Sequence, residues 1–308
     1  MIRRWPLLLI ILCSLAAGFG LLGIYHGQGE IVTAKPHEVE RIVSLAPNLT
    51  EILFALGLGG KIVAVSNDSD YPPDAAERNK IGTFWQPNTE AIIAARPDMV
   101  ITLSFEQQKN VADSLNRIGF NVLTLKIEKI EELLTAIEKI GIATGYKQSA
   151  DDLAENIATQ LNNLRSKFSS NKKVKVLWVV QNEPLRIAGK NTFVNELIEL
   201  AGGENAIGPT LQQYPPIGSE ELLVCGVEVI IQAAMGAAGN IPEQQKAANL
   251  FWSKFAHLPA VKNNKIYVIE PDTILRLGPR LPQGVELIAN CLHSDDFTKN
   301  PDISKVNR

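Results

Sequence analysis

NTEAIIAARPDMVI, residues 88–101, appears a second time, loosely, as GSEELLVCGVEVII at residues 218–231. Each copy places a glutamate, Glu90 or Glu220, behind a small polar residue and ahead of a mostly apolar segment, and a shorter apolar run follows. The polar start fits a helix N-terminus, where Asn88 can cap the first turn and Glu90 meets the positive end of the helix dipole. The stretch therefore predicts a helix, a tight turn and a strand, used twice.

The two copies also set the organisation of the whole chain. The apolar runs at residues 99–103 and 227–231 are typical of parallel strands that are buried on both faces. The copies lie too far apart for a solenoid, whose repeats recur about every 20 to 50 residues. Two similar α/β lobes in pseudo-symmetry are the economical interpretation, and the function is then expected between them.

The composition is that of an ordinary globular protein. The 308 residues are 45% hydrophobic and 20% charged, which is enough for one large core or two medium ones. The net charge is −3, and no run of lysines and arginines is interleaved with aromatic residues. Nucleic acid is therefore not expected as a partner.

The N-terminus predicts export. Arg3 and Arg4 precede a long apolar run, so residues 1–25 have the pattern of a secretory signal, and the run is also long enough to remain as an uncleaved membrane anchor. Bulky residues precede Cys13, which disfavours a lipoprotein signal. Residues 26–40 read as a polar tether.

Two cysteines remain outside the signal, Cys225 and Cys291. In an oxidising compartment a single disulfide is permitted. Two separate buried thiols, which behave as small hydrophobic residues, are an equal alternative.

Residues 41–127 are predicted to form the N-terminal lobe. Asn48, with Glu51 three residues later, has the pattern of a capping box for a helix that runs to Leu56 and stops at the following glycines. Alternation of helices with strands implies a parallel sheet that is covered on both faces. The strands are expected at residues 41–45, 62–65, 99–103 and 121–125.

Residues 128–170 are predicted to be purely helical and to join the lobes. Within residues 148–168 the apolar positions form one stripe, so this segment is expected to be a single helix about 30 Å long. A rigid helical link of this kind limits how far the lobes can swing.

Residues 171–293 are predicted to form the C-terminal lobe, followed by a disordered tail at residues 294–308. Gly202 and Gly203 are expected to end a helix in the left-handed conformation. The strands are expected at residues 174–180, 227–231 and 265–269, and the helices at residues 192–200, 244–255 and 282–292.

Motifs for catalysis and metal binding are absent from the sequence. There is no GxSxG elbow, P-loop, HExxH or CxxC, and the four histidines are scattered. No metal site and no intrinsic cofactor are expected.

Aromatic and turn-forming residues follow several predicted strands at their carboxyl ends, where open α/β sheets bind ligands. Each has a structural alternative, such as a turn, loop packing, or a surface salt bridge worth under about 1 kcal/mol. Together they favour a cleft for a large ligand with an apolar face. They are Tyr71-Pro72-Pro73, Phe84-Trp85, Phe105, Tyr214-Pro215-Pro216, and Asp272 with Arg276.

Three segments carry a resemblance to a known family. RIVSLAPNLTEILFALG at residues 41–57, SDYPP at residues 69–73 and the stretch at residues 88–101 resemble the periplasmic substrate-binding proteins of ABC importers for metal chelates, and within that family its vitamin B12-binding members. The match covers residues 41–292 and is less specific in the second lobe. The resemblance implies two α/β lobes joined by a single long helix, with the ligand between them and little closure on binding.

The resemblance also implies roles for individual residues. Glu90 and Glu220 become the acids, one per lobe, that dock onto arginines of the membrane permease. Phe84 and Tyr214 fall where B12-binding members have tryptophans, Trp85 lies beside the first, and Asp272 and Arg276 match directly. The full set of expected ligand-binding residues is Asp68, Tyr71, Phe84, Trp85, Arg186, Tyr214, Asp272 and Arg276.

Departures from the family pattern make the expected cleft more polar. Asp68 and Arg186 stand where B12-binding members have aromatic residues, and Thr273 and Ile274 replace an aromatic pair. Ala201 replaces a cysteine of the family's disulfide. A haem or a ferric siderophore therefore stays open beside a corrinoid as the ligand.

The expected function is that of a non-catalytic, exported solute-binding protein in the periplasm. It captures a corrinoid or a similar metal chelate and delivers it to an ABC permease and its ATPase. The alternatives are a haem or siderophore binder of the same importer class, and a periplasmic enzyme or sensor on the same scaffold.

Overall fold

The computed structural model describes residues 39–169, 172–235 and 240–293. The predicted signal or anchor, nearly all of the tether and the predicted tail lie outside the described residues. Within the described ranges no helix is both long enough and apolar enough to cross a bilayer.

The first lobe is built on a parallel five-stranded sheet with the order β3-β2-β1-β4-β5. Successive strand residues face opposite cores, so Ile42 packs with helices α2 and α6 while Val43 packs with α4 and α5. The helices are α2 (Pro47–Ala55), η1 (Gly59–Lys61), α3 (Pro73–Ala76), α4 (Thr89–Ala94), α5 (Glu106–Arg117) and α6 (Ile130–Thr144). The strands are β1 (Ile42–Ser44), β2 (Ile62–Val65), β3 (Asn79–Lys80), β4 (Met99–Leu103) and β5 (Val122–Leu125).

The predicted capping box at the start of α2 is wrong. The N-cap is Ala46, whose side chain makes no capping bond, and Pro47 opens the helix. Asn48 instead donates from Nδ2 to the Leu277 carbonyl oxygen at 3.1 Å, and Glu51 accepts from Arg280, both in the other lobe. Tertiary partners have overridden a local pattern.

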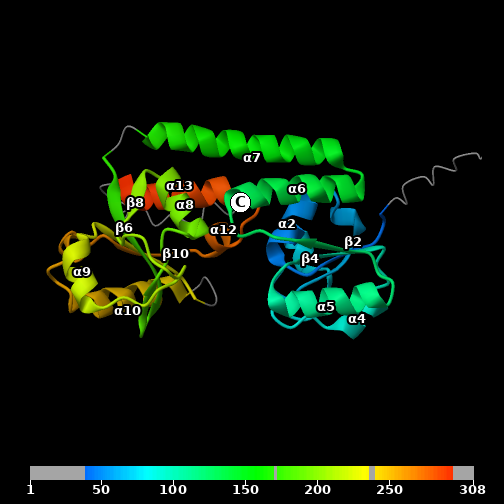
Figure 1. The fold of residues 1–308 in the computed structure, drawn as a ribbon, viewed down its shortest axis with the longest axis horizontal. Helices are drawn as coiled ribbons and strands as arrows, with labels where there is room; N and C mark the ends of the chain where they lie inside the picture. Colours follow the sequence, from blue (N-terminus) through cyan, green and yellow to red (C-terminus); the bar gives the residue numbers. More distant parts are fainter. Residues whose placement is uncertain (1–38, 170–171, 236–239, 294–308) are drawn as a thin grey trace, which may run out of the picture. The chain divides into compact units, whose positions relative to one another are not determined.

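Helix α7 (Lys147–Phe168) links the lobes and lies over α6 and α13 (Figure 1). Its buried positions include Ile157, Leu161 and Leu164, which belong to the predicted apolar stripe. Gly145, with a φ of 80°, ends α6 in the left-handed conformation and turns the chain back into α7.

The second lobe has a mixed sheet with the order β10-β9-β6-β7, and β8 also pairs with β6. β8, β9 and β10 pair in parallel within this sheet, whereas β7 forms an antiparallel hairpin with β6. β7 and β8 are too short to show a periodic pattern. The strands are β6 (Val174–Asn182), β7 (Leu185–Ile187), β8 (Gly203–Asn205), β9 (Val229–Ala233) and β10 (Ile266–Ile269). The helices are α8 (Phe193–Leu200), α9 (Ser219–Cys225), α10 (Ile241–Ser253), α11 (Pro259–Lys262), α12 (Asp272–Leu275) and α13 (Leu281–His293).

The sequence repeat is a structural repeat. α4 and β4 correspond to α9 and β9. In each copy one residue of the turn between the helix and the strand has a positive φ: Arg96 at 48° and Gly226 at 64°. Two positions later an acid anchors the neighbouring strand in each lobe. Asp98 accepts a hydrogen bond from the Arg41 backbone N–H, and Glu228 accepts one from the Lys175 backbone N–H.

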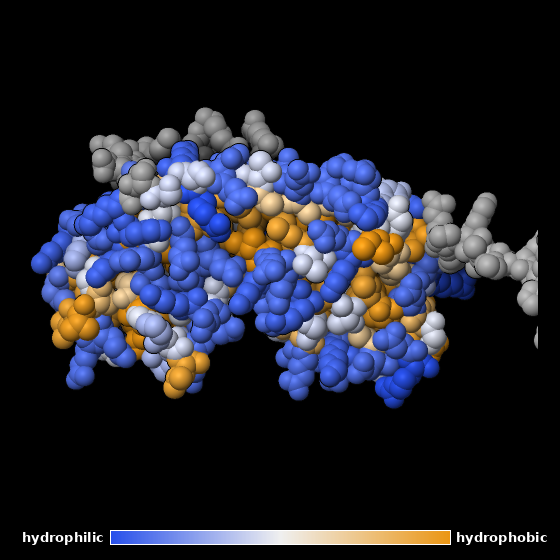
Figure 2. Space-filling model, turned by 45° about the horizontal axis from the view of Figure 1, so that its top comes forward, coloured by the Kyte–Doolittle hydropathy of each residue, from blue (hydrophilic) through white to orange (hydrophobic). Residues whose placement is uncertain are grey.

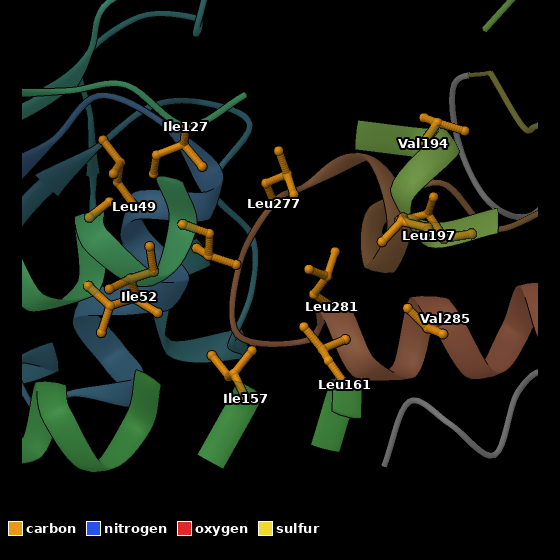
Figure 3. Close-up of a cluster of buried hydrophobic side chains, with 14 of the residues drawn as sticks. Leu49, Ile52, Ile127, Ile157, Leu161, Val194, Leu197, Leu277, Leu281 and Val285 are labelled. Carbon is orange, nitrogen blue, oxygen red and sulfur yellow. The ribbon is translucent and has the colours of Figure 1, made fainter. Parts of the chain in front are cut away.

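One hydrophobic core runs through both lobes. It contains Leu49 and Ile52 of the first lobe, Leu197 of the second, Leu277 between α12 and α13, and Leu281 at the start of α13 (Figure 3). Because both lobes bury side chains in the same core, a hinge motion would expose apolar surface. This arrangement opposes large changes in the angle between the lobes.

Cys225 and Cys291 are free and buried. They lie in two different hydrophobic clusters. Of the two alternatives that the sequence left open, separate buried thiols are therefore the correct one.

Candidate functional site

A cleft of about 600 Å³ lies between the lobes. The first lobe contributes the segments that follow each of its strands β1 to β5, and the second contributes the start of α8, the loop before α9 and the end of α12. Five of the eight predicted ligand-binding residues line it: Asp68, Phe84, Trp85, Tyr214 and Arg276. The other lining residues are Pro47, Asn48, Thr83, Leu103, Phe105, Ile127, Glu128, Thr192, Phe193, Gln213, Leu275 and Leu277.

An aromatic wall made of Phe84, Trp85 and Phe105 forms the side of the cleft in the first lobe. The rings of Phe84 and Trp85 meet edge to face with centroids 4.7 Å apart, and those of Phe84 and Phe105 do so at 5.7 Å. Such pairs fix the orientation of each ring relative to the next. Trp85 is the most exposed of the three, so a large part of its surface is available to a ligand.

Asp68 supports this wall as well as lining the cleft. Its Oδ2 accepts a hydrogen bond from the Phe84 backbone N–H at 2.9 Å. The polar residue that departs from the family pattern thus holds the loop that carries the aromatic pair.

Tyr214 faces the aromatic wall from the second lobe. Its loop is joined to the β7 region by the Arg186–Pro216 bridge and by a bond from the Gly189 N–H to the Gln213 carbonyl oxygen at 2.7 Å. Burial, followed by the negative charge of Glu128, raises the pKa of the Tyr214 phenol above its usual value. The phenol therefore stays protonated at neutral pH.

Arg186 does not line the cleft. Its Nη1 donates to the Tyr214 carbonyl oxygen at 3.1 Å, so it lies behind the tyrosine and holds its backbone. Arg186 lies in β7, and as a ligand contact it remains a prediction that the geometry does not favour.

Arg276 lines the cleft from the second lobe as a charged residue. It pairs with Asp70 at 2.6 Å, with Asp272 at 3.0 Å and with Glu51 at 3.5 Å, and its side chain is only 15% exposed. The salt bridge with Asp272 that the sequence allowed is therefore present, with the arginine largely buried. Burial lowers the pKa of this guanidinium, but the carboxylates of Asp70, Asp272 and Glu51 together raise it by more. The pKa therefore lies above its usual value, and the group stays charged. Burial is the largest effect on the pKa of Asp272 and raises it, although Arg276 acts in the opposite direction.

Tyr71 and Asp272 lie beside the cleft and not in its lining. The Arg280 guanidinium lies 3.9 Å from the centre of the Tyr71 ring, a cation–π contact. Asp272 forms an ion pair with Arg276. The Tyr71 contact joins the two lobes, whereas the Asp272 pair lies within the second lobe.

Sequence reasoning missed several apolar lining residues. Leu103 ends β4, and Ile127 follows β5, so the rule that ligands bind at carboxyl ends of strands points to both. Phe193 and Leu277 carry no such signal, because they reach the cleft through the packing of the second lobe.

Glu90 and Glu220 are exposed in the first turns of α4 and α9. Asn88 caps α4 as predicted, accepting from the Ala91 N–H at 3.0 Å. One turn after each acid an exposed aliphatic side chain follows, Ile93 in the first lobe and Leu223 in the second. Each lobe thus presents an acid beside an apolar side chain at equivalent positions of the repeat.

A second hollow lies on the helical layer, among α6, α7 and α8. Figure 2, in which the top of the Figure 1 view comes forward, shows hydrophobic surface framed by hydrophilic residues in the middle of this face. The hollow is lined by Ile130, Leu134, Leu161 and Leu200 together with charged residues, and its lining contains no aromatic residue. It lacks the aromatic side chains from both lobes that distinguish the cleft.

No group of three or more histidine, cysteine, aspartate or glutamate residues suited to a metal ion occurs within residues 39–169, 172–235 and 240–293. Among the described residues that line the cleft, the Tyr214 phenol is the one side chain besides the carboxylates that could bind a chelated metal directly.

Residues 42–273 match the family model described as periplasmic binding protein. The chain belongs to the periplasmic binding protein family. The resemblance inferred from residues 41–57, 69–73 and 88–101 is thereby confirmed, as is the architecture of two α/β lobes. This is a family of solute-binding proteins that act in transport.

Relatives within the periplasmic binding protein family include vitamin B12- and haem-binding proteins. A vitamin B12-binding protein of Vibrio parahaemolyticus is 30% identical over 272 residues, which cover 87% of this chain and 94% of the relative. The crystal structure of the periplasmic vitamin B12-binding protein of Vibrio cholerae is 28% identical, with a TM-score of 0.70, covering 82% of this chain and 96% of that chain. The periplasmic haem-binding protein of the same organism is 25% identical, with a TM-score of 0.72, covering 82% of this chain and 99% of that chain.

Proposed function

We propose that this protein is an exported solute-binding protein that captures a corrinoid in the cleft and delivers it to an ABC permease and its ATPase. The observation that carries the proposal is an open cleft with aromatic residues on both lobes, Phe84, Trp85 and Phe105 opposite Tyr214. A corrinoid presents a broad apolar ring face with amide groups at its edge. The aromatic side chains suit that face, and Asn48 and Gln213 in the lining suit amides.

The ligand chemistry of the cleft favours a corrinoid over haem. Haem iron is held in proteins by a histidine, cysteine, methionine or tyrosine. Tyr214 is the one such residue in the lining, and its raised pKa disfavours the phenolate that binds ferric iron. The cobalt of a cobalamin already carries its axial ligands, so it requires none from the protein.

Haem is the second candidate. Tyr214 lies in the cleft, and haem-binding relatives share the fold. In that case the iron would have to lower the pKa of the phenol on binding, and replacing Tyr214 by phenylalanine would abolish the complex.

The charges of the cleft disfavour anionic ferric chelates. Asp68 and Glu128 are acids, and the single arginine of the lining, Arg276, is neutralised by Asp70 and Asp272. An anionic ligand would therefore lose its hydration without gaining a free cation.

Catalysis is not part of the proposal. A catalytic pair would need a free base beside a nucleophile. Asp68 is engaged by the Phe84 N–H, and Arg276 by three carboxylates, so neither has the freedom that acid–base chemistry requires.

Glu90 and Glu220 are proposed as the points of contact with the permease. Both acids are exposed, and each has an exposed aliphatic neighbour, Ile93 or Leu223. A permease with basic residues beside apolar ones would be complementary to both lobes at once. Docking would take place in the periplasm, with the N-terminal segment either removed or retained as an anchor.

Calorimetric titration of the exported protein with cyanocobalamin tests the proposal. We expect one-to-one binding near nanomolar, which corresponds to roughly −12 kcal/mol. The matched titrations use haemin and a ferric siderophore. Absence of heat with cyanocobalamin, together with tight binding of haemin, would replace the proposal by its second candidate.

A further inference from the structure

We propose that Gln108 is the positioning residue of the aromatic wall, acting through the backbone of Phe84. The inference rests on the proposed function in one respect only, namely that the cleft is the ligand site. Gln108 belongs to the first turn of α5 and does not line the cleft. Sequence reasoning gave it no role.

The Gln108 side-chain amide makes four hydrogen bonds, all to residues of the first lobe. Oε1 accepts from the Thr102 hydroxyl at 2.7 Å and from the Leu103 N–H at 2.9 Å. Nε2 donates to the carbonyl oxygens of Leu45 and Phe84, both at 3.1 Å. The side chain is 1% exposed, so water does not compete for these bonds.

These partners connect the scaffold to the loop. Leu45 follows β1, the central strand of the sheet, and Leu103 ends the neighbouring strand β4, so these bonds fix the amide to rigid structure. The remaining donor holds the Phe84 carbonyl oxygen. Gln108 therefore fixes the loop that carries Phe84 and Trp85 in its position relative to the sheet.

The other backbone polar group of the same residue is held by Asp68, which accepts from the Phe84 N–H. The base of the loop is closed by the Gly82–Pro87 bridge, and Gly82 has a φ of 95° in a place where a Cβ would lie 2.5 Å from the Gln86 carbonyl oxygen. The base is thus fixed by its own backbone, whereas Asp68 and Gln108 reach the tip from outside the loop. Removing Gln108 should free the tip and leave the base.

Ordering such a loop on binding lowers affinity, because the ligand must then supply the free energy that fixes the side chains. Pre-positioning by Gln108 avoids that cost. The predicted consequence is that loss of the amide weakens ligand binding although no ligand contact is removed.

The test uses Gln108→Met, which keeps the length of the side chain and removes every hydrogen bond. The matched control is Gln245→Met in the second lobe. Gln245 makes the same kind of bonds, from Nε2 to the Ile266 carbonyl oxygen and from the Val268 N–H to Oε1, but lies outside the cleft lining.

The first readout needs no ligand and therefore does not depend on the proposed function. Trp85 is 61% exposed, whereas Trp178 and Trp252 are 2% and 0% exposed. Iodide quenching of tryptophan emission, measured against the Trp85→Phe form of each protein, isolates Trp85. We expect Gln108→Met to change its quenching and shift its emission, and Gln245→Met to leave both as in the wild type.

The second readout is titration with cyanocobalamin. We expect Gln108→Met to weaken binding by about tenfold or more, equivalent to about 1.4 kcal/mol, and Gln245→Met to change it by less than about twofold. If the wild type binds no cyanocobalamin, the proposed function fails while the quenching result still decides the role of Gln108.

Gln108→Glu provides a second variant if the methionine variant does not fold. At neutral pH its second carboxylate oxygen would face the carbonyl oxygens of Leu45 and Phe84, and binding should be lost. Burial raises the pKa of such a carboxyl, and once protonated it can again donate to one carbonyl oxygen. Binding by Gln108→Glu should therefore recover as the pH falls. Wild-type quenching of Trp85 and wild-type affinity in both Gln108 variants would overturn the proposal.

Discussion

Arg280 places two guanidinium nitrogens on the carboxylate of Glu51, at 2.9 and 2.6 Å, across 229 positions of sequence. Glu51 belongs to α2 in the first lobe and Arg280 directly precedes α13 in the second. Both side chains are buried, at 2% and 11% exposure. This bidentate pair ties the lobes together, and α2 and α13 also contribute to the hydrophobic core that the lobes share, for example with Leu49 and Leu281 (Figure 3).

Breaking this tie should cost more stability than an ordinary salt bridge. Glu51→Gln leaves the buried Arg280 guanidinium without its carboxylate, and we expect it to lower the free energy of unfolding by about 3 to 5 kcal/mol. Arg280→Met leaves Glu51 with Arg276 alone, at 3.5 Å, and should cost less than Glu51→Gln. The control is Lys147→Met, which removes the exposed pair with Asp151 in α7 and should cost under about 0.5 kcal/mol. Urea unfolding measures both. Losses of equal size at the two sites would show that the interlobe pair acts as a surface pair.

The pH dependence of the folding stability should reflect the raised pKa of Asp272. Burial raises the pKa of Asp272 in the folded state, so between the unfolded and folded pKa values the folded protein binds more protons. Stability from this group therefore falls as the pH rises from just below 4 through the folded pKa. We expect the free energy of unfolding of the wild type, relative to Asp272→Asn, to decrease over that window. A difference that grows with pH would mean that Arg276 controls the pKa, not burial.

The aromatic residues should contribute to affinity without holding the fold. Tyr214→Ala, and Phe84→Ala combined with Trp85→Ala, should each weaken cyanocobalamin binding by about 1 to 3 kcal/mol. Ile118→Ala is the control, since Ile118 is exposed and outside the cleft lining. Calorimetry gives the affinities, and thermal unfolding shows that the variants fold. Unchanged affinity in a folded Tyr214→Ala protein would place Tyr214 outside the binding site.

The two acids at the helix starts should affect transport and not ligand binding. Replacing Glu90 or Glu220 by alanine should leave the affinity for cyanocobalamin unchanged and cost about 0.3 to 1 kcal/mol of stability through the helix dipole. Uptake by vesicles that contain the cognate permease should fall, and further with lysine, because like charges would then meet. Glu243→Lys, in the first turn of α10, is the matched control. Full uptake by the Glu90→Lys, Glu220→Lys protein would remove the docking role from both residues.

The repeat at residues 88–101 and 218–231 was enough to predict two α/β lobes, because periodicity and helix capping are local properties. The same local reasoning failed at Asn48 and Glu51, whose partners Leu277 and Arg280 lie in the other lobe. It also missed the antiparallel strand β7, which is three residues long and owes its pairing to β6.

For the cleft, the rule of strand ends led to the correct edge but not to the orientation of each side chain. Asp68, Trp85 and Tyr214 line the cleft, whereas Tyr71 and Arg186 pack behind it. Which side of a loop faces the ligand is decided by tertiary hydrogen bonds, and a single sequence does not record these. Gln108 escaped notice for the same reason.

The most direct test of the central claim is a competition for the cleft. The exported protein is dialysed to equilibrium against equal concentrations of cyanocobalamin and haemin, and the retained ligand is identified by its absorption spectrum. The account predicts one cyanocobalamin per protein and no retained haem, because Tyr214 stays protonated and the corrinoid needs no axial ligand from the protein. Retention of one haem per protein with the spectrum of a tyrosinate-bound ferric iron, and no corrinoid, would contradict it.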